Sequence, residues 1–325
     1  MEKVSQEALN AAFSEMLESP QESRTLAEAG VTWIKQRLRE ESFARKIMPP
    51  QNITKFDCQR AVNTDTIEKI VDLETISTAM ALNFRSQAPA QFVEGTRYRI
   101  PFFKISTPLY EKSEEELLAY EMPIMKLIED NAVKDIHEIE DETFLRYAWA
   151  SVQATGQILN VTGTNVLSDK RMLTELFKML ETGGPTATTP NRLCTATLLI
   201  NTGTWNDIAG LPNEQLGTPM NSEVFKDGYA YHEILGKKLI VTTKTNLVPY
   251  GTIWAFAEQK FLGNFYILNN TKFWIEKKAE MIRCKTWEVI GMGVGNIKGI
   301  ARLCFGDGLC QVSGIGRTVS ISDIT

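Results

Sequence analysis

The sequence has little of the chemistry that most enzymes need. Only two histidines, His137 and His232, occur among its 325 residues. It lacks the GxSxG motif of serine hydrolases, the phosphate-binding loop of P-loop nucleotidases and the HExxH motif of zinc proteases. His137 lies among carboxylates on the polar side of a predicted helix and His232 follows a polar loop, so we expect both to be solvated. We therefore predict no catalytic residue, no bound metal and no cofactor.

Cysteine is also scarce and shows no spacing pattern. The five cysteines are Cys58, Cys194, Cys284, Cys304 and Cys310. An odd number without a CxxC pair argues against a disulfide framework and against a zinc site. We expect most of them to be small buried residues. Whether Cys58 meets a cysteine across an interface stays open.

Long apolar runs and an excess of basic charge are missing as well. No segment approaches the roughly 20 apolar residues that a membrane helix needs, and the charged N-terminus has no signal-peptide core. Lysine and arginine number 35 against 40 acidic residues, a formal net charge of −5. No overall positive field therefore attracts nucleic acid. The sequence predicts a soluble protein that is made in a cytosol and has no membrane partner.

One glycine-rich run invites a nucleotide-binding interpretation. Gly291, Gly293 and Gly295 follow apolar residues in VIGMGVGN, as in a dinucleotide-binding loop. Asn296 stands where GxGxxG has its last glycine, and only about 30 residues follow, too few for further βαβ units. We predict a tight turn between two strands instead. A nucleotide-binding oxidoreductase remains the weaker alternative.

The most regular pattern runs from Ser113 to Ala150. A stripe with helical spacing consists of Leu118, Met122, Met125, Ile128, Ala132, Ile136, Ile139, Thr143 and Tyr147. Ser113 followed by Glu116 predicts a capping box, and Pro123 predicts a kink. A polar face, expected to be solvated, consists of Asp130, Lys134, Glu138 and Asp141. The pattern predicts one long helix, either on the surface of an α+β domain or as the spine of a multi-domain subunit.

Acidic clusters at 114–116 and 138–142 lie on this predicted helix. They lack the spacing of an EF-hand, and one helical face cannot surround a calcium ion. We attribute them to helix capping and solubility.

The chain before this helix falls into two parts. Residues 1–48 predict two short helices, at 5–19 and 25–46, which form an arm with little core of its own. Residues 51–108 predict a long two-stranded excursion, in which Tyr98, Ile100 and Phe102 alternate with Arg97 and Arg99. Since an isolated hairpin is not stable, it must pack on its own subunit or lie across another. The sequence leaves both options open.

The chain after the helix predicts a compact α/β domain followed by a return to a sheet. Residues 153–166 are expected to be a small polar connector, and 168–182 an amphipathic helix. Its predicted apolar face consists of Met172, Leu173, Leu176, Phe177 and Leu180. Ala301–Phe305 is expected to close a sheet, and residues 306–325 form a polar tail that can add one edge strand.

Three stretches resemble the major capsid proteins of tailed bacteriophages, which have the Hong Kong 97-type capsid fold. EGTRYRIPFFKISTPLYEKSEEELLAYEMPIMKLIEDNAVKDI is similar to the second strand of the extended loop running into the spine helix. TATLLINTGTWNDIAGL followed by ILGKKLIVTTKT is similar to the axial domain. GTIWAFAEQKFLGNFYILNNTKFWIEKKAEMIRCKTWEVIGMGVGNIKGIARL is similar to the return into the peripheral domain. The resemblance lies in order and spacing and covers about residues 50–305.

This resemblance implies an α+β subunit with four parts. The implied parts are an N-terminal arm (1–48), an extended β-hairpin loop over a neighbouring subunit (49–108), a peripheral domain with the spine helix (109–154 and 268–325) and an axial α/β domain around the capsomer axis (155–267). Copies would assemble as hexamers and pentamers into an icosahedral shell around packaged DNA, contacted non-specifically. The expected location is the virion capsid, after synthesis in the host cytoplasm.

The resemblance also implies partners other than the chain itself. Residues 1–48 are too short for a typical fused scaffold, so a separate scaffolding protein is expected, with a portal and decoration proteins as further candidates. Some relatives crosslink a lysine to an asparagine, but no motif identifies Lys55, Lys69 or Asn296 as such a partner, and we predict no crosslink. An encapsulin-like compartment of the same fold, without DNA, is the alternative within this fold.

Overall fold

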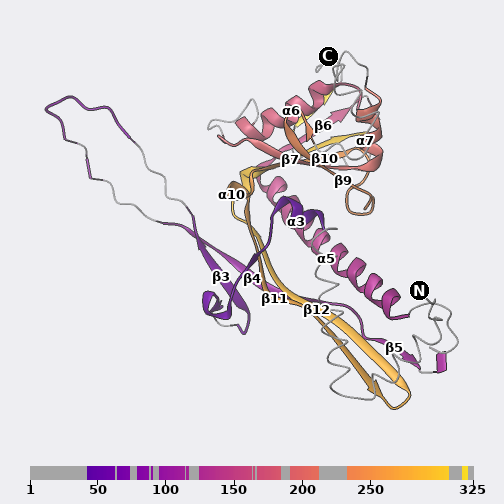
Figure 1. The fold of residues 1–325 in the computed structure, drawn as a ribbon. Helices are drawn as coiled ribbons and strands as arrows, with labels where there is room; N and C mark the ends of the chain where they lie inside the picture. Colours follow the sequence, from indigo (N-terminus) through magenta and orange to yellow (C-terminus); the bar gives the residue numbers. More distant parts are fainter. Residues whose placement is uncertain are drawn as a thin grey trace, which may run out of the picture.

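The protein is described here by a computed structural model. The structure describes residues 42–62, 64–73, 79–87, 89–90, 95–113, 115–116, 124–162, 164, 167–183, 191–211, 233–306 and 317–320. The expected arm, apart from its last residues, lies outside this part of the chain, as do His232, Cys310 and Pro123. Figure 1 shows two sheets joined by one long helix.

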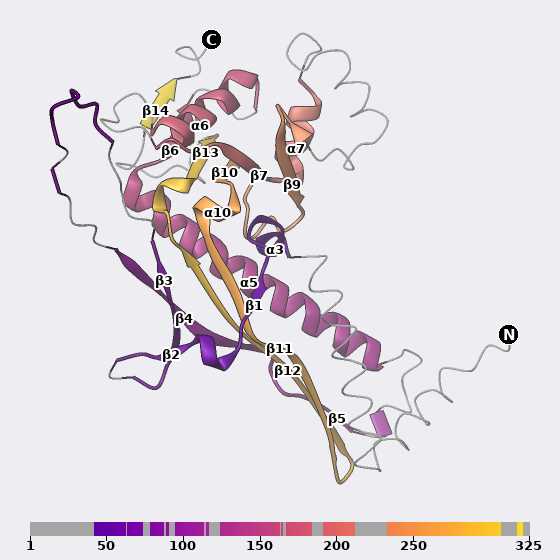
Figure 2. The ribbon, with the colours of Figure 1, turned by 60° about the vertical axis from the view of Figure 1, so that its left-hand side comes forward.

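The first sheet is built around a long hairpin. Its strands are β1 (Gln51–Asn52), β2 (Gln59–Arg60), β3 (Ile67–Asp72), β4 (Arg97–Ser106), β5 (Tyr110–Ser113), β11 (Gly263–Lys278) and β12 (Met281–Val294). The order is β1-β11-β12-β4-β3-β2, and β5 pairs with the far part of β12. Figure 2 shows β11 and β12 running together away from the second sheet, with β5 near their end.

The second sheet is mixed and follows the order β14-β6-β13-β10-β7-β9-β8. Its strands are β6 (Ile158–Thr162), β7 (Thr195–Asn201), β8 (Glu233–Ile234), β9 (Lys237–Thr242), β10 (Thr252–Ala257), β13 (Ile300–Phe305) and β14 (Arg317–Ser320). Successive side chains of β10 alternate between the two faces of the sheet. Ile253 and Ala255 enter the core on one face, and Trp254 and Phe256 enter the core on the other. Both faces of this sheet are therefore covered.

Helices cover these faces. They are α3 (Phe43–Ile47), α5 (Ile124–Thr155), α6 (Lys170–Thr182), α7 (Thr202–Ala209) and α10 (Gln259–Leu262), with 3-10 turns η1 (Lys55–Asp57) and η3 (Ile297–Gly299). In Figure 1, α6 lies on one side of the second sheet and α5 on the other. Phe144 of α5 packs 6.5 Å from Phe43 and 5.4 Å from Phe256, measured between ring centroids. One core thus ties α3 and α5 to both sheets.

Several predictions from local pattern are confirmed. β4 alternates as expected, with Ile100 and Phe102 buried and Arg97 and Arg99 exposed. The predicted helix at 168–182 is α6, whose N-cap Asp169 accepts a bond from the Arg171 amide. All five residues of its predicted apolar face are buried. A 16-residue and a 14-residue strand form the expected strand–turn–strand near the C-terminus.

The inner face of the long helix was predicted correctly in part, because Ala132 and Ile136 are fully buried. The described part of α5 begins at Ile124 and ends at Thr155, and residues 117–123 of the predicted helix lie outside the described chain. Ile139, expected inside, is 40% exposed, whereas Asp141, expected to be solvated, is fully buried. The reason is that the Asp141 carboxylate accepts hydrogen bonds from the Ser42–Ala44 segment at the start of α3 and from Lys244 after β9, so the buried face includes a charged residue.

Two further expectations change. The predicted polar connector contains β6, whose residues 158–161 are buried between β13 and β14 in the second sheet. The predicted glycine-rich turn is part of β12 itself up to Val294. The partition into domains stays a prediction, although strand pairing places β13 and β14 in the second sheet and not beside the long hairpin.

Candidate assembly interface

The feature that departs most from a compact subunit is the projection between β3 and β4. The two strands pair from Glu68 opposite Pro101 to Asp72 opposite Arg97. The Leu73 amide then donates to the Thr96 carbonyl at 2.8 Å and closes this pairing. In Figures 1 and 2, residues 79–87 lie far beyond the strands and away from both sheets. These residues are all exposed.

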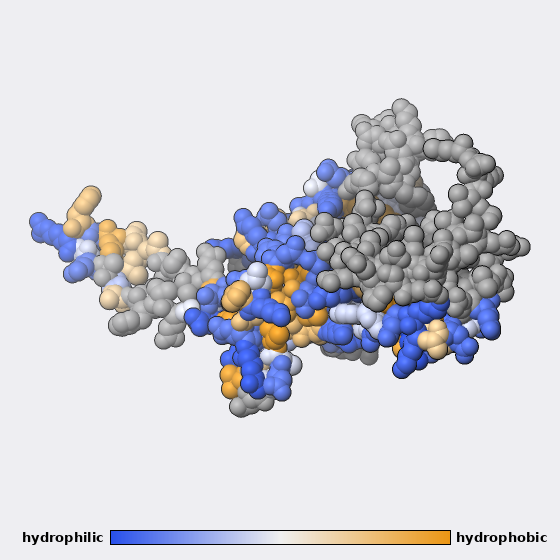
Figure 3. Space-filling view, turned by 60° about the horizontal axis from the view of Figure 1, so that its bottom comes forward, coloured by the Kyte–Doolittle hydropathy of each residue, from blue (hydrophilic) through white to orange (hydrophobic). Residues whose placement is uncertain are grey.

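The outer end of this projection carries large apolar side chains. Met80 and Leu82 are 54% and 45% exposed, and Phe84 is fully exposed. Figure 3 shows hydrophobic atoms gathered at this end, separated from the body of the molecule. Grouped exposed apolar side chains mark surfaces that bind another molecule. The geometry of the projection allows them to reach a surface well outside their own subunit.

The root of the projection is held by the glycine-rich part of β12. A Cβ atom added at Gly291 would lie 2.7 Å from the Phe102 ring, and one at Gly293 would lie 2.8 Å from Cγ1 of Ile100. The absence of side chains at these positions lets β4 residues lie directly on the β12 backbone. Tyr98 also accepts a hydrogen bond from the Asn264 amide at 2.7 Å. The glycines therefore determine the position at which the hairpin leaves the sheet. Because β4 side chains cover them, Gly291 and Gly293 do not form an open nucleotide-binding loop.

A buried ionic cluster joins α3, α5 and β12 in the centre of the molecule. Arg45 donates to both carboxylate oxygens of Glu140, from Nη2 at 2.6 Å and from Nε at 3.0 Å. Its Nη2 also lies 3.0 Å from Glu288. Thr271 donates to the second oxygen of Glu288 at 3.1 Å. All three charged side chains are buried, so one guanidinium holds three distant segments together.

A second buried carboxylate lies next to this cluster. Asp141 accepts hydrogen bonds from the Ser42 hydroxyl at 2.9 Å and the Ala44 amide at 3.0 Å. Its other oxygen lies 2.6 Å from Nζ of Lys244. Burial raises the pKa of Asp141, while Lys244 and the two hydrogen bonds oppose the increase. The N-terminal end of α3 is thus fastened to α5 and to the segment after β9.

Burial also shifts the ionisation of the Arg45 cluster. Desolvation, with Glu288 close by, raises the pKa of Glu140 to about 7, although Arg45 opposes the change. Burial by itself would lower the pKa of Arg45, but the two carboxylates outweigh it and raise that pKa. Two carboxylates that share one cation leave a net negative charge in a region of low dielectric constant, which favours one added proton.

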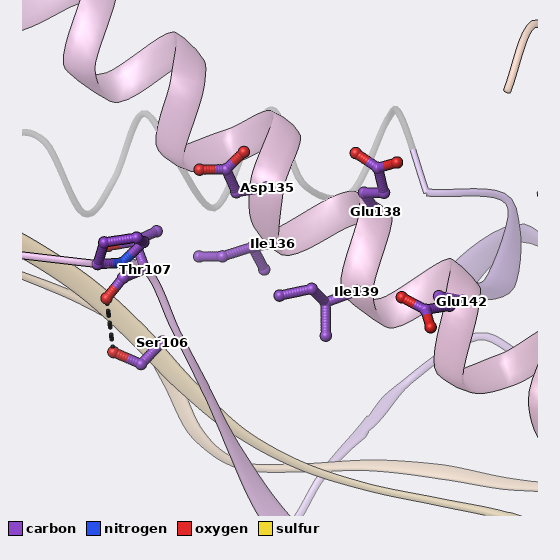
Figure 4. Close-up of a pocket in the computed structure, with 8 residues that line it drawn as sticks. Ser106, Thr107, Asp135, Ile136, Glu138, Ile139 and Glu142 are labelled. Carbon is purple, nitrogen blue, oxygen red and sulfur yellow. Dashed lines mark hydrogen bonds between the residues drawn. The ribbon is translucent and has the colours of Figure 1, made fainter. Parts of the chain in front are cut away.

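A groove of about 300 Å³ lies between α5 and the end of β4. Figure 4 shows Asp135, Glu138 and Glu142 spread along the helix, with Ile136 and Ile139 between them. Tyr110 donates to Asp135 at 2.7 Å, Asn246 donates to Glu138, and Arg146 donates to Glu142 at 2.8 Å. Each carboxylate already has a donor, so the groove is not arranged as a catalytic pair.

The structure separates the other residues that the sequence singled out. His137 is 2% exposed, so its predicted solvation is wrong. Cys284 is buried, Cys194 is exposed, and Cys304 is buried and disulfide-bonded. Within the described chain, no group of three or more histidine, cysteine and acidic residues could hold a metal ion. No described helix is long and apolar enough to cross a membrane.

No pattern in the sequence predicted the Arg45 cluster. Its members are 95 and 243 residues apart along the chain, so no local motif records them. One signal was available: Glu140 lies four residues after Ile136 and four before Phe144, on the same side of a helix. A carboxylate in that apolar row points to a buried cation.

Comparison with known proteins was informative only at the level of structure. No family model and no curated protein matches the sequence. A solved structure from Microbacterium phage Oxtober96 matches with a TM-score of 0.56 and 12% identity, over 82% of this chain and 91% of that one. One from Mycobacterium phage Bobi matches with a TM-score of 0.56 and 10% identity, over the same shares.

A third similar solved structure is the capsid structure of the cyanophage P-SCSP1u. It matches with a TM-score of 0.53 and 10% identity, over 77% of this chain and 86% of its own. Identities this low establish the fold alone, and the mixed α+β architecture predicted from the sequence agrees with it. The chain has the fold of a phage capsid protein.

Proposed function

We propose that this chain is the major capsid protein of a tailed phage. Copies would assemble as hexamers and pentamers into an icosahedral shell that encloses the DNA genome. The role is structural and not enzymatic, and the protein's location is the virion capsid after synthesis in the host cytoplasm. The observation that carries the proposal is the projecting hairpin, whose exposed apolar tip has no core of its own.

Physical reasoning supports an intermolecular role for this hairpin. A two-stranded ribbon in water is marginal at best, and its described tip residues are all exposed. Covering one large apolar side chain contributes roughly 1.5–3 kcal/mol. Three such side chains, Met80, Leu82 and Phe84, therefore supply a modest contact. Repeated around a closed symmetric shell, modest contacts produce a stable particle.

The finer organisation of the Hong Kong 97-type fold is part of the proposal. Residues 49–108 would be the extended loop over a neighbouring subunit, and 1–48 the arm that clasps another. Residues 109–154 with 268–325 would form the peripheral domain, and 155–267 the axial domain. A separate scaffolding protein, a portal and decoration proteins are the expected partners of the shell.

The test is assembly of a tip variant. Phe84→Asp places a charge where the proposal puts an apolar contact, so purified protein should remain folded but form few or no particles. Phe84→Leu keeps an apolar side chain at the same position and serves as the matched control, which should assemble. Particle formation is measured by size-exclusion chromatography and negative-stain electron microscopy, with the scaffolding protein co-expressed. Normal shells from Phe84→Asp would reject the intersubunit role of the tip.

A further inference from the structure

A second cavity lies farther along α5, between the C-terminal half of this helix and the second sheet, and Glu142 lines it as well as the first groove. Its volume is about 260 Å³. Arg302 of β13 lies opposite Trp254 of β10 in the antiparallel pairing, and Thr252 lies two residues before Trp254. Residues paired directly, and residues two apart on one strand, share a face of the sheet. All three therefore line the cavity from the same face, and Trp149 of α5 lines it from above.

Arg302 is held between aromatic rings without an acceptor. Its guanidinium carbon lies 4.6 Å from the Trp149 ring centroid and 5.4 Å from that of Trp254. The residue is only 8% exposed, and its Nε has no hydrogen-bond partner. Burial lowers its pKa to about 10, and no carboxylate opposes that change. An arginine stays charged at neutral pH, so this buried cation is left without a counter-charge among the described residues.

Two further donors on the same wall are unpaired. Nε1 of Trp254 and Oγ1 of Thr252 are buried and make no hydrogen bond. The described chain holds six buried side-chain atoms without a hydrogen bond, of which Nε of Arg283 still lies 2.8 Å from a Glu111 oxygen, and three of the other five belong to this one cavity. An indole N–H and a guanidinium can only donate, and a hydroxyl can donate as well as accept. The wall thus offers a concentrated set of donors, and since buried polar groups are normally paired, it lacks a matching acceptor.

We propose that this cavity binds a small free oxyanion of the size of inorganic phosphate. An oxyanion accepts from all three donors at once and neutralises Arg302, whereas water alone supplies acceptors without the negative charge. Arg146 and Glu142 also line the cavity and pair with each other at 2.8 Å, so together they add no net charge and leave Arg302 as the uncompensated cation. Bound there, the anion would fasten α5 to the second sheet, independently of how subunits assemble.

The experiment titrates phosphate into purified full-length protein against chloride at equal ionic strength. We expect a saturable rise in unfolding temperature with phosphate and a change in tryptophan emission, because two indoles line the cavity. Acetate in a parallel titration distinguishes a tetrahedral oxyanion from a carboxylate. No saturable response to phosphate, or an equal response to chloride, would overturn the proposal.

Three variants sharpen this test. Arg302→Met keeps an unbranched side chain between the rings, so it should unfold at a higher temperature than wild type without phosphate and should not respond to phosphate. Trp254→Phe removes one donor but keeps a ring, and should weaken phosphate binding roughly tenfold. Arg97→Met, in an exposed ion pair of the hairpin far from the cavity, should respond as wild type does. An unchanged phosphate response in both Arg302→Met and Trp254→Phe would rule the site out.

Discussion

At the scale of single residues, the most consequential group is the pair of carboxylates around Arg45. Removing one partner of a buried ionic group leaves an uncompensated charge and costs about 3–5 kcal/mol. Exposed ion pairs such as Arg146 with Glu142 contribute at most about 1 kcal/mol. The stability of this protein therefore depends on a few buried charges far more than on its many surface pairs.

The ionisation of Glu140 predicts a pH-dependent stability. Its pKa is about 7 in the folded protein, above the value of about 4.3 in an unfolded chain. The folded state then holds a proton that the unfolded state releases, so this stabilisation is fully present below about pH 4.3 and is lost as the pH rises through 7. Between pH 5 and 8, the free energy of unfolding of the wild type should fall by about 1–3 kcal/mol more than that of Glu140→Gln, as measured by unfolding in urea.

The matched control for this prediction is Glu142→Gln, which removes a carboxylate in an exposed pair on the same helix. Its stability should follow the wild-type dependence on pH. Parallel pH profiles for wild type and Glu140→Gln would contradict the prediction.

At the scale of elements, the glycines of β12 leave room for side chains of β4 to pack directly on the β12 backbone. The Cβ of an alanine at Gly291 would lie 2.7 Å from the Phe102 ring. Extra atoms in a close-packed contact typically cost about 1–3 kcal/mol. We expect Gly291→Ala to lower the free energy of unfolding by that amount, measured by chemical denaturation.

A second substitution tests whether the contact itself is the cause. Phe102→Leu reduces the side chain that the new methyl group meets, so the double variant Gly291→Ala with Phe102→Leu should be more stable than the sum of the single changes allows. A neutral Gly291→Ala, or strictly additive effects, would mean that the close approach of β4 to β12 does not limit this site.

At the scale of the whole molecule, the described chain divides into a body with three hydrophobic clusters, which include the strands β3 and β4, and a hairpin tip outside that body. The described tip residues contribute to no hydrophobic core. Because the Leu73 amide already bonds to the Thr96 carbonyl, residues 74–95 can be replaced by an Asn-Gly turn that suits a two-residue hairpin. The shortened chain should keep its stability within about 1 kcal/mol.

The same variant should nevertheless fail to form particles, because the tip that reaches another subunit is gone. Unfolding is followed by circular dichroism and assembly by electron microscopy. Both measurements are also made on the wild type as the reference. A shortened chain that forms regular shells would show that the projection is dispensable, whereas one that does not fold would show that it belongs to the body.

The amino-acid sequence by itself determined the elements whose signal is local. The alternation in β4, the apolar face of α6 and its Asp169 cap, and the paired strands near the C-terminus follow from side chains only a few positions apart. The order of these elements was also sufficient to predict the capsid-type α+β fold. Such patterns can be read without a structure because helix and strand periodicities dictate which neighbours share a face.

Tertiary structure alone decided that Glu140 and Asp141 of α5 are buried, where β6 lies and what the glycines of β12 contact. In each case the deciding partner is remote in sequence: Arg45 lies 95 residues from Glu140 and 243 from Glu288. A carboxylate on a helix is solvated unless a distant segment brings a cation and excludes water, and a glycine is a turn unless another strand lies against it. Polarity is a local property of the chain, but burial depends on how the whole molecule packs.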